Sequence, residues 1–167
     1  MPKKIRDWIE SILFAGAVVA ILFVVFWPFS VSGSSMEPCL SDRERIAISR
    51  VTLWLGRYGR GDIVVCKQER VGKVENVVKR IIGVPGDLLE IRDGDVYING
   101  ELLPEDYLLH NHTAGELEVE LAAGEYFVMG DNRSVSADSR NAGPVKSDEI
   151  VGRVVMRWFP FNKIAVY

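Results

Sequence analysis

A long apolar run near the N-terminus constrains this chain more than any other feature. Residues 12–29, ILFAGAVVAILFVVFWPF, are 18 consecutive residues without a charge. A helix of that length is just long enough to cross a hydrocarbon core of about 30 Å. Trp8 and Trp27 lie near its two ends, where a membrane–water interface favours aromatic side chains. The run therefore predicts a transmembrane anchor helix over residues 12–29.

The charges on either side of the run predict its orientation. Three cations precede it, and the first cation after it is Arg43. The preceding ones are Lys3, Lys4 and Arg6. Because Lys and Arg are enriched on the cytoplasmic side of membrane helices, we expect residues 1–11 to form a short cytoplasmic N-terminus. Residues 30–167 would then lie outside the plasma (inner) membrane, behind a single pass.

A cleaved secretory signal is the alternative interpretation of the same run. The residues SVSG that follow it are small enough for a cleavage site. Against this alternative, the apolar segment is longer than the usual core of about 7–15 residues. The bulky side chains of Trp27 and Phe29 also crowd the region where cleavage would occur. In both interpretations, the remainder of the chain is extracytoplasmic.

Composition excludes several classes of function. The 167 residues suit one ordinary domain with an appendage, and a net charge of −3 gives no reason to expect a nucleic-acid partner. Cys39 and Cys66 are too few for a disulfide framework, so one bridge and two free thiols both remain open. His110 and His112 are the two histidines, and a zinc site needs three or four ligands. We therefore expect no metal and no cofactor.

The part of the chain after residue 30 is rich in short β-branched segments. Asp93-Gly94 and Asn99-Gly100 are strong hairpin signals between such segments, and no stretch keeps a helical period over three turns. The fold class we predict is an all-β, mostly antiparallel extracytoplasmic domain behind one N-terminal transmembrane α-helix. The expected strands are 44–51, 62–67, 76–84, 88–91, 95–98, 116–121, 125–130 and 150–158.

Two polar features interrupt this β pattern. The densest polar run, GDNRSVSADSR (residues 130–140), follows an apolar strand. It fits either a solvated loop or a functional site at the end of a rigid strand. In VVKRIIGVPGD, Lys79 and Arg80 lie in the middle of an apolar strand, and strand alternation places them on opposite faces. One of them must therefore lie among apolar side chains, unless both mark an edge strand.

A lysine on an apolar face has a specific chemical use. Desolvation lowers the pKa of an amine, and the neutral amine is a general base. Such a base activates a neighbouring serine hydroxyl without histidine, and serine–lysine catalysis is a known variant of the catalytic triad. The sequence has no Ser-His-Asp pattern, so Lys79 and one of the serines in SVSGSSMEPC (residues 30–39) are candidates for this chemistry.

Four segments together resemble the bacterial type I signal peptidases. SGSSMEPC is similar to the Ser-Met-x-Pro nucleophile segment of that family, and the remaining motifs follow in the family's order. Those motifs are RGDIVV (residues 60–65), KRIIGVPGD (79–87) and GDNRSVSADSR (130–140). The resemblance implies a membrane-anchored serine endopeptidase that removes signal peptides from exported preproteins, with membrane lipid around its anchor.

The resemblance also assigns roles to individual residues. Ser35 matches the nucleophile, Lys79 the general base, and Ser136 the serine that orients the lysine amine. Four further residues match structural support around the site: Arg80, Asp131, Asp138 and Arg140. The nucleophile loop, which also forms the oxyanion hole through the backbone N–H of Ser35, includes Gly33, Ser34, Met36 and Pro38.

The sequence departs from the family pattern at two positions. Some members place a hydroxyl two residues before the nucleophile, where this chain has Gly33, so a backbone donor is expected instead. Cys39 stands where threonine is usual after the proline, and Cys66 is a candidate partner if it is oxidised.

The resemblance further implies a substrate preference. An extended substrate would lie beside the nucleophile by strand addition, with shallow pockets for small side chains at the first and third positions before the scissile bond. Three other interpretations remain open: an organellar version of the same peptidase, a self-cleaving serine–lysine regulator, and a non-enzymatic anchored β domain.

Overall fold

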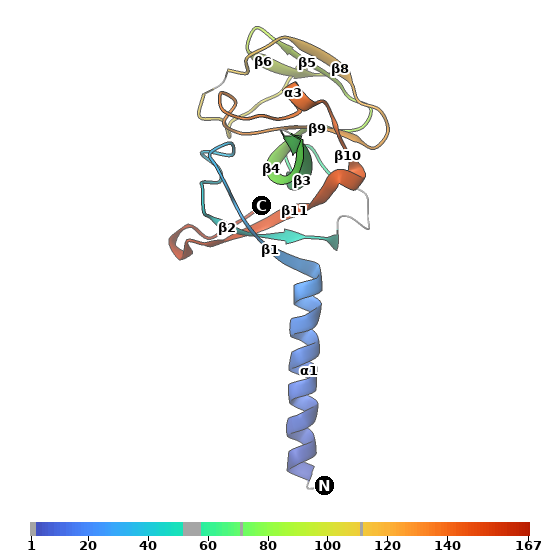
Figure 1. Ribbon diagram of the computed structural model, residues 1–167, viewed down its shortest axis with the longest axis vertical. Helices are drawn as coiled ribbons and strands as arrows, with labels where there is room; N and C mark the ends of the chain where they lie inside the picture. The colour runs from blue at the N-terminus through green and yellow to red at the C-terminus, as the bar shows by residue number, and fades with distance from the viewer. Residues whose placement is uncertain (1–2, 52–57, 71, 111) are drawn as a thin grey trace.

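The computed structural model describes residues 3–51, 58–70, 72–110 and 112–167, without the side chains of residues 3, 20–24 and 70. An N-terminal helix leads into a β domain built from two sheets (Figure 1). Residues 1–2 of the predicted cytoplasmic segment lie outside the described residues. So do the side chains of residues 20–24 in the predicted anchor.

The helix α1 (Lys3–Val25) covers most of the apolar run 12–29, but it ends before the run does. Residues Phe26–Ser30 form strand β1, which pairs antiparallel with β2 (Arg45–Ser49). The predicted helix over 12–29 is therefore wrong at its C-terminal end. Pro28 lacks the N–H that a helix interior needs, whereas an edge strand such as β1 tolerates it.

From residue 4 to residue 19 the side chains of α1 are exposed, with Ile12 at 65%, Leu13 at 66% and Phe14 at 73%. Among the described residues, no helix is both long enough and apolar enough to cross a membrane.

The larger sheet lies nearer to α1 in Figure 1. Over the described residues its strand order is β1-β2-β11-β3-β4-β9-β10, with β12 pairing β11, and all of the pairings are antiparallel. The strands not yet bounded are β3 (Ile63–Arg70), β4 (Lys73–Gly83), β9 (Glu125–Met129), β10 (Val145–Lys146), β11 (Ile150–Phe159) and β12 (Ala165–Val166). Short helical segments flank them: α3 (Ser139–Ala142), η1 (Ser147–Glu149) and η2 (Phe161–Lys163).

The smaller sheet lies at the end of the molecule farthest from the N-terminus of α1 (Figure 1). Its strand order is β7-β6-β5-β8, with β5 (Leu88–Arg92), β6 (Asp95–Ile98), β7 (Glu101–Leu102) and β8 (Leu117–Glu120). Both predicted hairpin turns are confirmed, because Asp93-Gly94 joins β5 to β6 and Asn99-Gly100 joins β6 to β7. All four turn residues have the positive φ that this type of two-residue turn requires.

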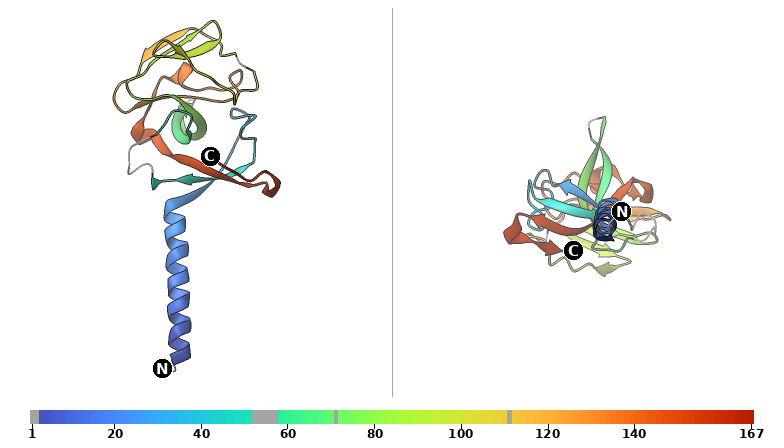
Figure 2. Two further views of the ribbon diagram at one scale, coloured as in Figure 1. Left: turned by 180° about the vertical axis from the view of Figure 1, so that it is seen from behind. Right: turned by 90° about the horizontal axis from the view of Figure 1, so that it is seen from below.

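Strand β4 is buried from Val78 to Gly83 and lies between β3 and β9. The edge-strand interpretation is therefore wrong for Arg80, which pairs with both β3 and β9, whereas Lys79 pairs with β3 alone and is buried all the same. The side chains of β4 belong to three apolar clusters, represented by Val78, Ile81 and Ile82. The opposite end of β4 forms, with β3, a hairpin that projects from the domain (Figure 2).

Candidate active site

The chain turns sharply after β1, and this turn carries Ser35. Met36 and Leu40 are buried in the same apolar cluster, so the turn is held to the sheet on its inner side. Within the turn, Glu37 N–H donates to Ser34 O (3.2 Å) and Leu40 N–H to Met36 O (2.8 Å). These contacts leave Ser35 half-buried at the surface of the turn.

Gly33 has a backbone reason to be glycine. Its φ of +85° lies in the left-handed region that other residues rarely adopt. Its N–H donates to Asp42 Oδ1 (2.8 Å), which holds the chain as it enters the turn.

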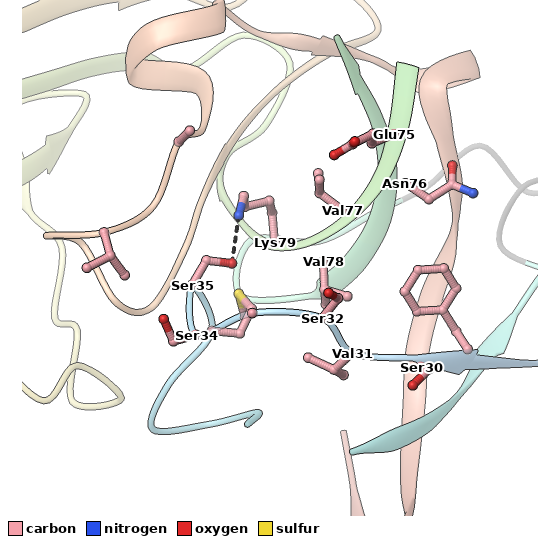
Figure 3. Close-up of a pocket in the computed structure, with 15 residues that line it drawn as sticks. Ser30, Val31, Ser32, Ser34, Ser35, Glu75, Asn76, Val77, Val78 and Lys79 are labelled. Atoms are coloured by element: carbon pink, nitrogen blue, oxygen red, sulfur yellow. Dashed lines mark hydrogen bonds between the residues drawn. The ribbon is translucent and has the colours of Figure 1, made fainter. Parts of the chain in front are cut away.

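The structure brings Lys79 to Ser35. The Lys79 side chain is buried, with 3% exposure for the residue, and its Nζ donates a hydrogen bond to Ser35 Oγ at 2.9 Å (Figure 3). The two residues are 44 positions apart in the chain. The interior position of Lys79 in β4 fixes its backbone, so the amine reaches the nucleophile turn from a rigid element.

Arg80 points away from Lys79 and forms a buried ion pair. Its Nε and Nη2 donate to the two carboxylate oxygens of Asp131 at 2.8 and 2.6 Å. Its Nη1 donates to Gly61 O (2.9 Å), and the guanidinium lies 4.1 Å from the ring centroid of Tyr107. Arg80, one of the expected support residues, therefore pairs with another of them, Asp131.

Burial and the ion pair act in opposite directions on the pKa values of this pair. Burial raises the pKa of the Asp131 carboxyl more than Arg80 lowers it. Burial alone would lower the pKa of Arg80, but its hydrogen bonds and charge interaction with Asp131 raise it above the usual value.

The loop after β9 lies directly against the nucleophile turn. Asn132 N–H donates to Ser35 O (3.0 Å). A Cβ at Gly130 would lie 2.4 Å from both Ser35 O and Ser136 Oγ, so only glycine fits this approach of the two segments. The sequence pointed to this loop, but it did not single out Gly130 or Asn132.

Asp138 and Arg140 hold the other end of this loop. Asp138 accepts hydrogen bonds from Gly130 N–H (3.1 Å) and from Arg140 Nε (2.9 Å). Burial would raise the pKa of the Asp138 carboxyl, but the hydrogen bonds and charge of Arg140, with help from Ser136 and Gly130, lower it. Asp138 is therefore a structural anion at neutral pH.

Ser136 is buried beside Gly130, and its Oγ has no hydrogen bond of good geometry within the described residues. It lies close enough to Asp138 to help lower the pKa of that carboxyl. Its role in orienting the lysine amine stays a prediction.

Sequence analysis missed a buried polar cluster that supports the same loop from the segment between β7 and β8. Arg133 Nε donates to Gly130 O (3.1 Å), and Arg133 Nη1 donates to Glu105 Oε2 (2.9 Å). Arg133 also donates to Thr113 Oγ1. Arg133 belongs to the polar run that the sequence singled out, but no local signal connects it to Glu105.

A cavity of about 260 Å³ opens beside the Lys79–Ser35 pair. One wall is the segment 29–36 and the other is residues 75–79 of β4 (Figure 3). Val135 and Ala137 also line the cavity. Along 73–79, β4 pairs with β3 on one side, while its pairing with β9 begins at Arg80. The arrangement leaves a strand edge toward the cavity, which suits an extended peptide.

The two cysteines are free thiols, so no bridge joins Cys39 to Cys66. Burial raises the pKa of the Cys39 thiol and raises that of Cys66 to about 12, so both thiols are protonated at neutral pH. Within the described part of the chain, no three His, Cys, Asp or Glu side chains gather in a way that could hold a metal ion.

Comparisons with known proteins agree with this geometry. The family model described as signal peptidase, peptidase S26, matches residues 5–159. Signal peptidase I U of Bacillus subtilis is 38% identical over 97% of this chain and 92% of its own length. Signal peptidase IB of Staphylococcus aureus is 37% identical over 98% of this chain and 94% of its own length. The crystal structure of a signal peptidase I from Enterococcus faecalis, 36% identical, covers 58% of this chain and 96% of its own with a TM-score of 0.52.

Proposed function

Since this chain belongs to the signal peptidase family, peptidase S26, we propose that Ser35 and Lys79 are the dyad with which it cleaves signal peptides. The protein is a serine endopeptidase that acts on preproteins carrying a signal peptide. The observation that carries the dyad assignment is the 2.9 Å contact between buried Lys79 Nζ and Ser35 Oγ.

In the proposed acylation step, the Lys79 amine takes the proton from Ser35 Oγ. The 2.9 Å separation suits that transfer, and burial favours the neutral form of an amine over the charged form. The Ser35 oxygen attacks the scissile carbonyl carbon and forms a tetrahedral oxyanion. The backbone N–H of Ser35 is the proposed oxyanion donor, since the residue two positions earlier, Gly33, has no side-chain hydroxyl.

The tetrahedral intermediate then collapses. The carbon–nitrogen bond breaks, the leaving amine takes the proton from Lys79, and the signal peptide remains as an ester on Ser35. Lys79, neutral again, takes a proton from water, which attacks the ester carbon. The bond between that carbon and Ser35 Oγ then breaks, Ser35 Oγ takes the proton back from Lys79, and the signal peptide is released with a free carboxyl group. The ion pair of Arg80 with Asp131 would support this cycle by fixing the strand beside Lys79.

We expect substrate choice to depend on small side chains near the bond. The cavity of about 260 Å³ lies between two extended segments, so several residues of an extended peptide would share it, which favours alanine over an aromatic ring beside Ser35. A preprotein with alanine at the first and third positions before the bond should be cleaved, and phenylalanine at the first position should abolish cleavage. Gel analysis of the products, with mass determination of the cut site, measures this preference.

Ser35→Ala is the control for that experiment, since it should be inactive on every substrate. Equal cleavage rates for the alanine and phenylalanine substrates would contradict the proposed pocket but not the dyad. Cleavage by Ser35→Ala would contradict the dyad.

We also propose that α1 is a single-pass plasma-membrane anchor with the catalytic domain outside. The support is the uncharged run 12–29, the cations that precede this run, and the exposed apolar side chains of the helix. Such an anchor would hold Ser35, only a few residues beyond β1, near the membrane surface where a membrane-spanning signal peptide presents its cleavage site.

Deleting residues 1–25 tests the anchor. This deletion keeps β1 in its pairing with β2, which a deletion through residue 29 would remove. The shortened protein should cleave short peptides at the wild-type rate. It should lose at least about tenfold in efficiency on preproteins in vesicles, since enzyme and substrate no longer share a membrane. Equal efficiency on vesicle-bound preprotein would contradict the anchor.

A further inference from the structure

Arg157, in the C-terminal part of the chain, forms a hydrogen bond with the nucleophile turn. It belongs to β11, and its side chain is 14% exposed. Its Nη1 donates to Cys39 O at 2.9 Å and to Glu44 Oε2 at 3.0 Å, while its Nε donates to Lys163 O at 2.6 Å. Arg157 and Cys39 are 118 positions apart, and none of the motifs that the sequence singled out contains Arg157.

The contact with Cys39 O reaches almost to the nucleophile. The Cys39 carbonyl and the Leu40 N–H belong to one peptide group, and that N–H donates to Met36 O at 2.8 Å. Since this peptide group is planar and rigid, Arg157 constrains the position of Met36 O through it. Met36 directly follows Ser35, so two hydrogen bonds connect Arg157 to the residue after the nucleophile.

Two neighbouring residues, Glu44 and Tyr167, add to the contacts of Arg157 with the turn. The Glu44 carboxylate, which is 5% exposed, accepts from Ser41 N–H (3.1 Å) as well as from Arg157. The Tyr167 hydroxyl donates to Cys39 O at 3.4 Å, and burial raises its pKa to about 12, so that it keeps its proton at neutral pH. Thus Cys39 O has donors from both β11 and Tyr167.

We propose that Arg157 is a positioning residue for the cleavage reaction: it holds the nucleophile turn so that Ser35 Oγ stays within reach of Lys79. This inference rests on the proposed dyad. On the dyad side, Asn132 N–H holds Ser35 O, and on the opposite side Arg157 holds Cys39 O, so the turn is held at both ends. Loss of one hold lets Ser35 move relative to the Lys79 amine.

Arg157→Ala in the full-length protein tests the proposal. A displacement of about 1 Å costs up to roughly 10²-fold in rate, so kcat on a short peptide should fall at least about tenfold. KM should stay within about twofold, because neither Arg157 nor Cys39 lines the cavity. Arg153→Ala is the matched control: Arg153 lies on the same strand and pairs with Asp62, but the structure places it in no contact with the turn. Its kcat should be unchanged.

Arg157→Ala leaves the buried Glu44 carboxylate without its main partner, so all rates are measured per folded molecule, by circular dichroism and gel filtration. Arg157→Lys is the second variant, since it keeps a cation beside Glu44 but has no planar fork to serve Cys39 O and Lys163 O together. Its kcat should lie between those of wild type and Arg157→Ala. If Arg157→Ala does not fold, a drop of at least about threefold in kcat for Arg157→Lys supports the proposal, and an unchanged kcat contradicts it.

A folded Arg157→Ala variant with kcat within about twofold of wild type would overturn the inference. An equal loss in Arg153→Ala would overturn it as well, because the effect would then belong to β11 as a whole. Ser35→Ala in the same assay separates this outcome from failure of the dyad. An active Ser35→Ala variant contradicts the dyad. If Ser35→Ala is inactive and Arg157→Ala has the wild-type kcat, only the positioning role of Arg157 is contradicted.

Discussion

Arginine in place of Lys79 is expected to be nearly as damaging as alanine. Arginine keeps the positive charge but does not lose its proton in proteins, so it cannot serve as a general base. If the Lys79 amine removes the proton from Ser35, kcat should fall by about 10²–10⁴ in both variants, the loss typical of a missing general base. Cleavage of one preprotein or peptide, followed under saturating substrate, measures the effect.

Lys73→Arg is the matched control, because Lys73 lies on the same strand, β4, at an exposed position. We expect it to cleave at the wild-type rate. If a folded Lys79→Arg variant cleaved within about threefold of wild type, Lys79 would act as a charge and not as a base.

The second large effect is on stability. Asp131→Ala removes one partner of a buried bidentate ion pair in which the Asp131 side chain is 1% exposed and the Arg80 side chain 11%. The Arg80 guanidinium would remain buried without its counter-ion, which costs about 3–5 kcal/mol. That is a large share of the roughly 5–15 kcal/mol by which domains are usually stable. Urea unfolding in detergent, followed by tryptophan fluorescence, measures the loss.

Two further variants distinguish a buried charge from general damage. Asp62→Ala removes the partner of Arg153 from a more exposed pair, with side chains 22% and 36% exposed, together with the acceptor of Gly59 N–H. It should cost at most about 2 kcal/mol. The double variant Arg80→Met/Asp131→Leu removes both buried charges and should be more stable than Asp131→Ala alone. Equal losses for Asp131→Ala and Asp62→Ala would show that burial of the Arg80–Asp131 pair carries no special weight.

Local patterns in the sequence predicted most of the β domain correctly. Period-two alternation and β-branched segments marked the longer strands, and the two Gly-containing turn dipeptides marked the hairpins of the smaller sheet. The strands that sequence analysis missed, β1, β7, β10 and β12, were either very short or hidden inside the apolar run. A strand of two residues has too little pattern to be recognised.

The prediction of the site had a different basis. Composition and alternation raised the question of why Lys79 lies in an apolar strand, but the family resemblance assigned it to Ser35. The structure then placed Lys79 Nζ 2.9 Å from Ser35 Oγ, so the pair is brought together as that resemblance implied. Arg80 with Asp131, and Asp138 with Arg140, form ion pairs among the four residues that the resemblance named as structural support.

By itself, the sequence determined the longer strands and the two hairpin turns, because these depend on neighbours a few residues apart. It pointed to the reactive groups through the resemblance of its four motifs to a known family. Only the tertiary structure decided that Phe26–Ser30 is a strand, since an edge strand exists only where a partner such as β2 satisfies its backbone. It also decided the contacts of Arg133 with Glu105 and of Arg157 with Cys39. Those contacts depend on the order and register of strands distant in the chain, and no local pattern of side chains specifies which distant groups the packed sheets bring together.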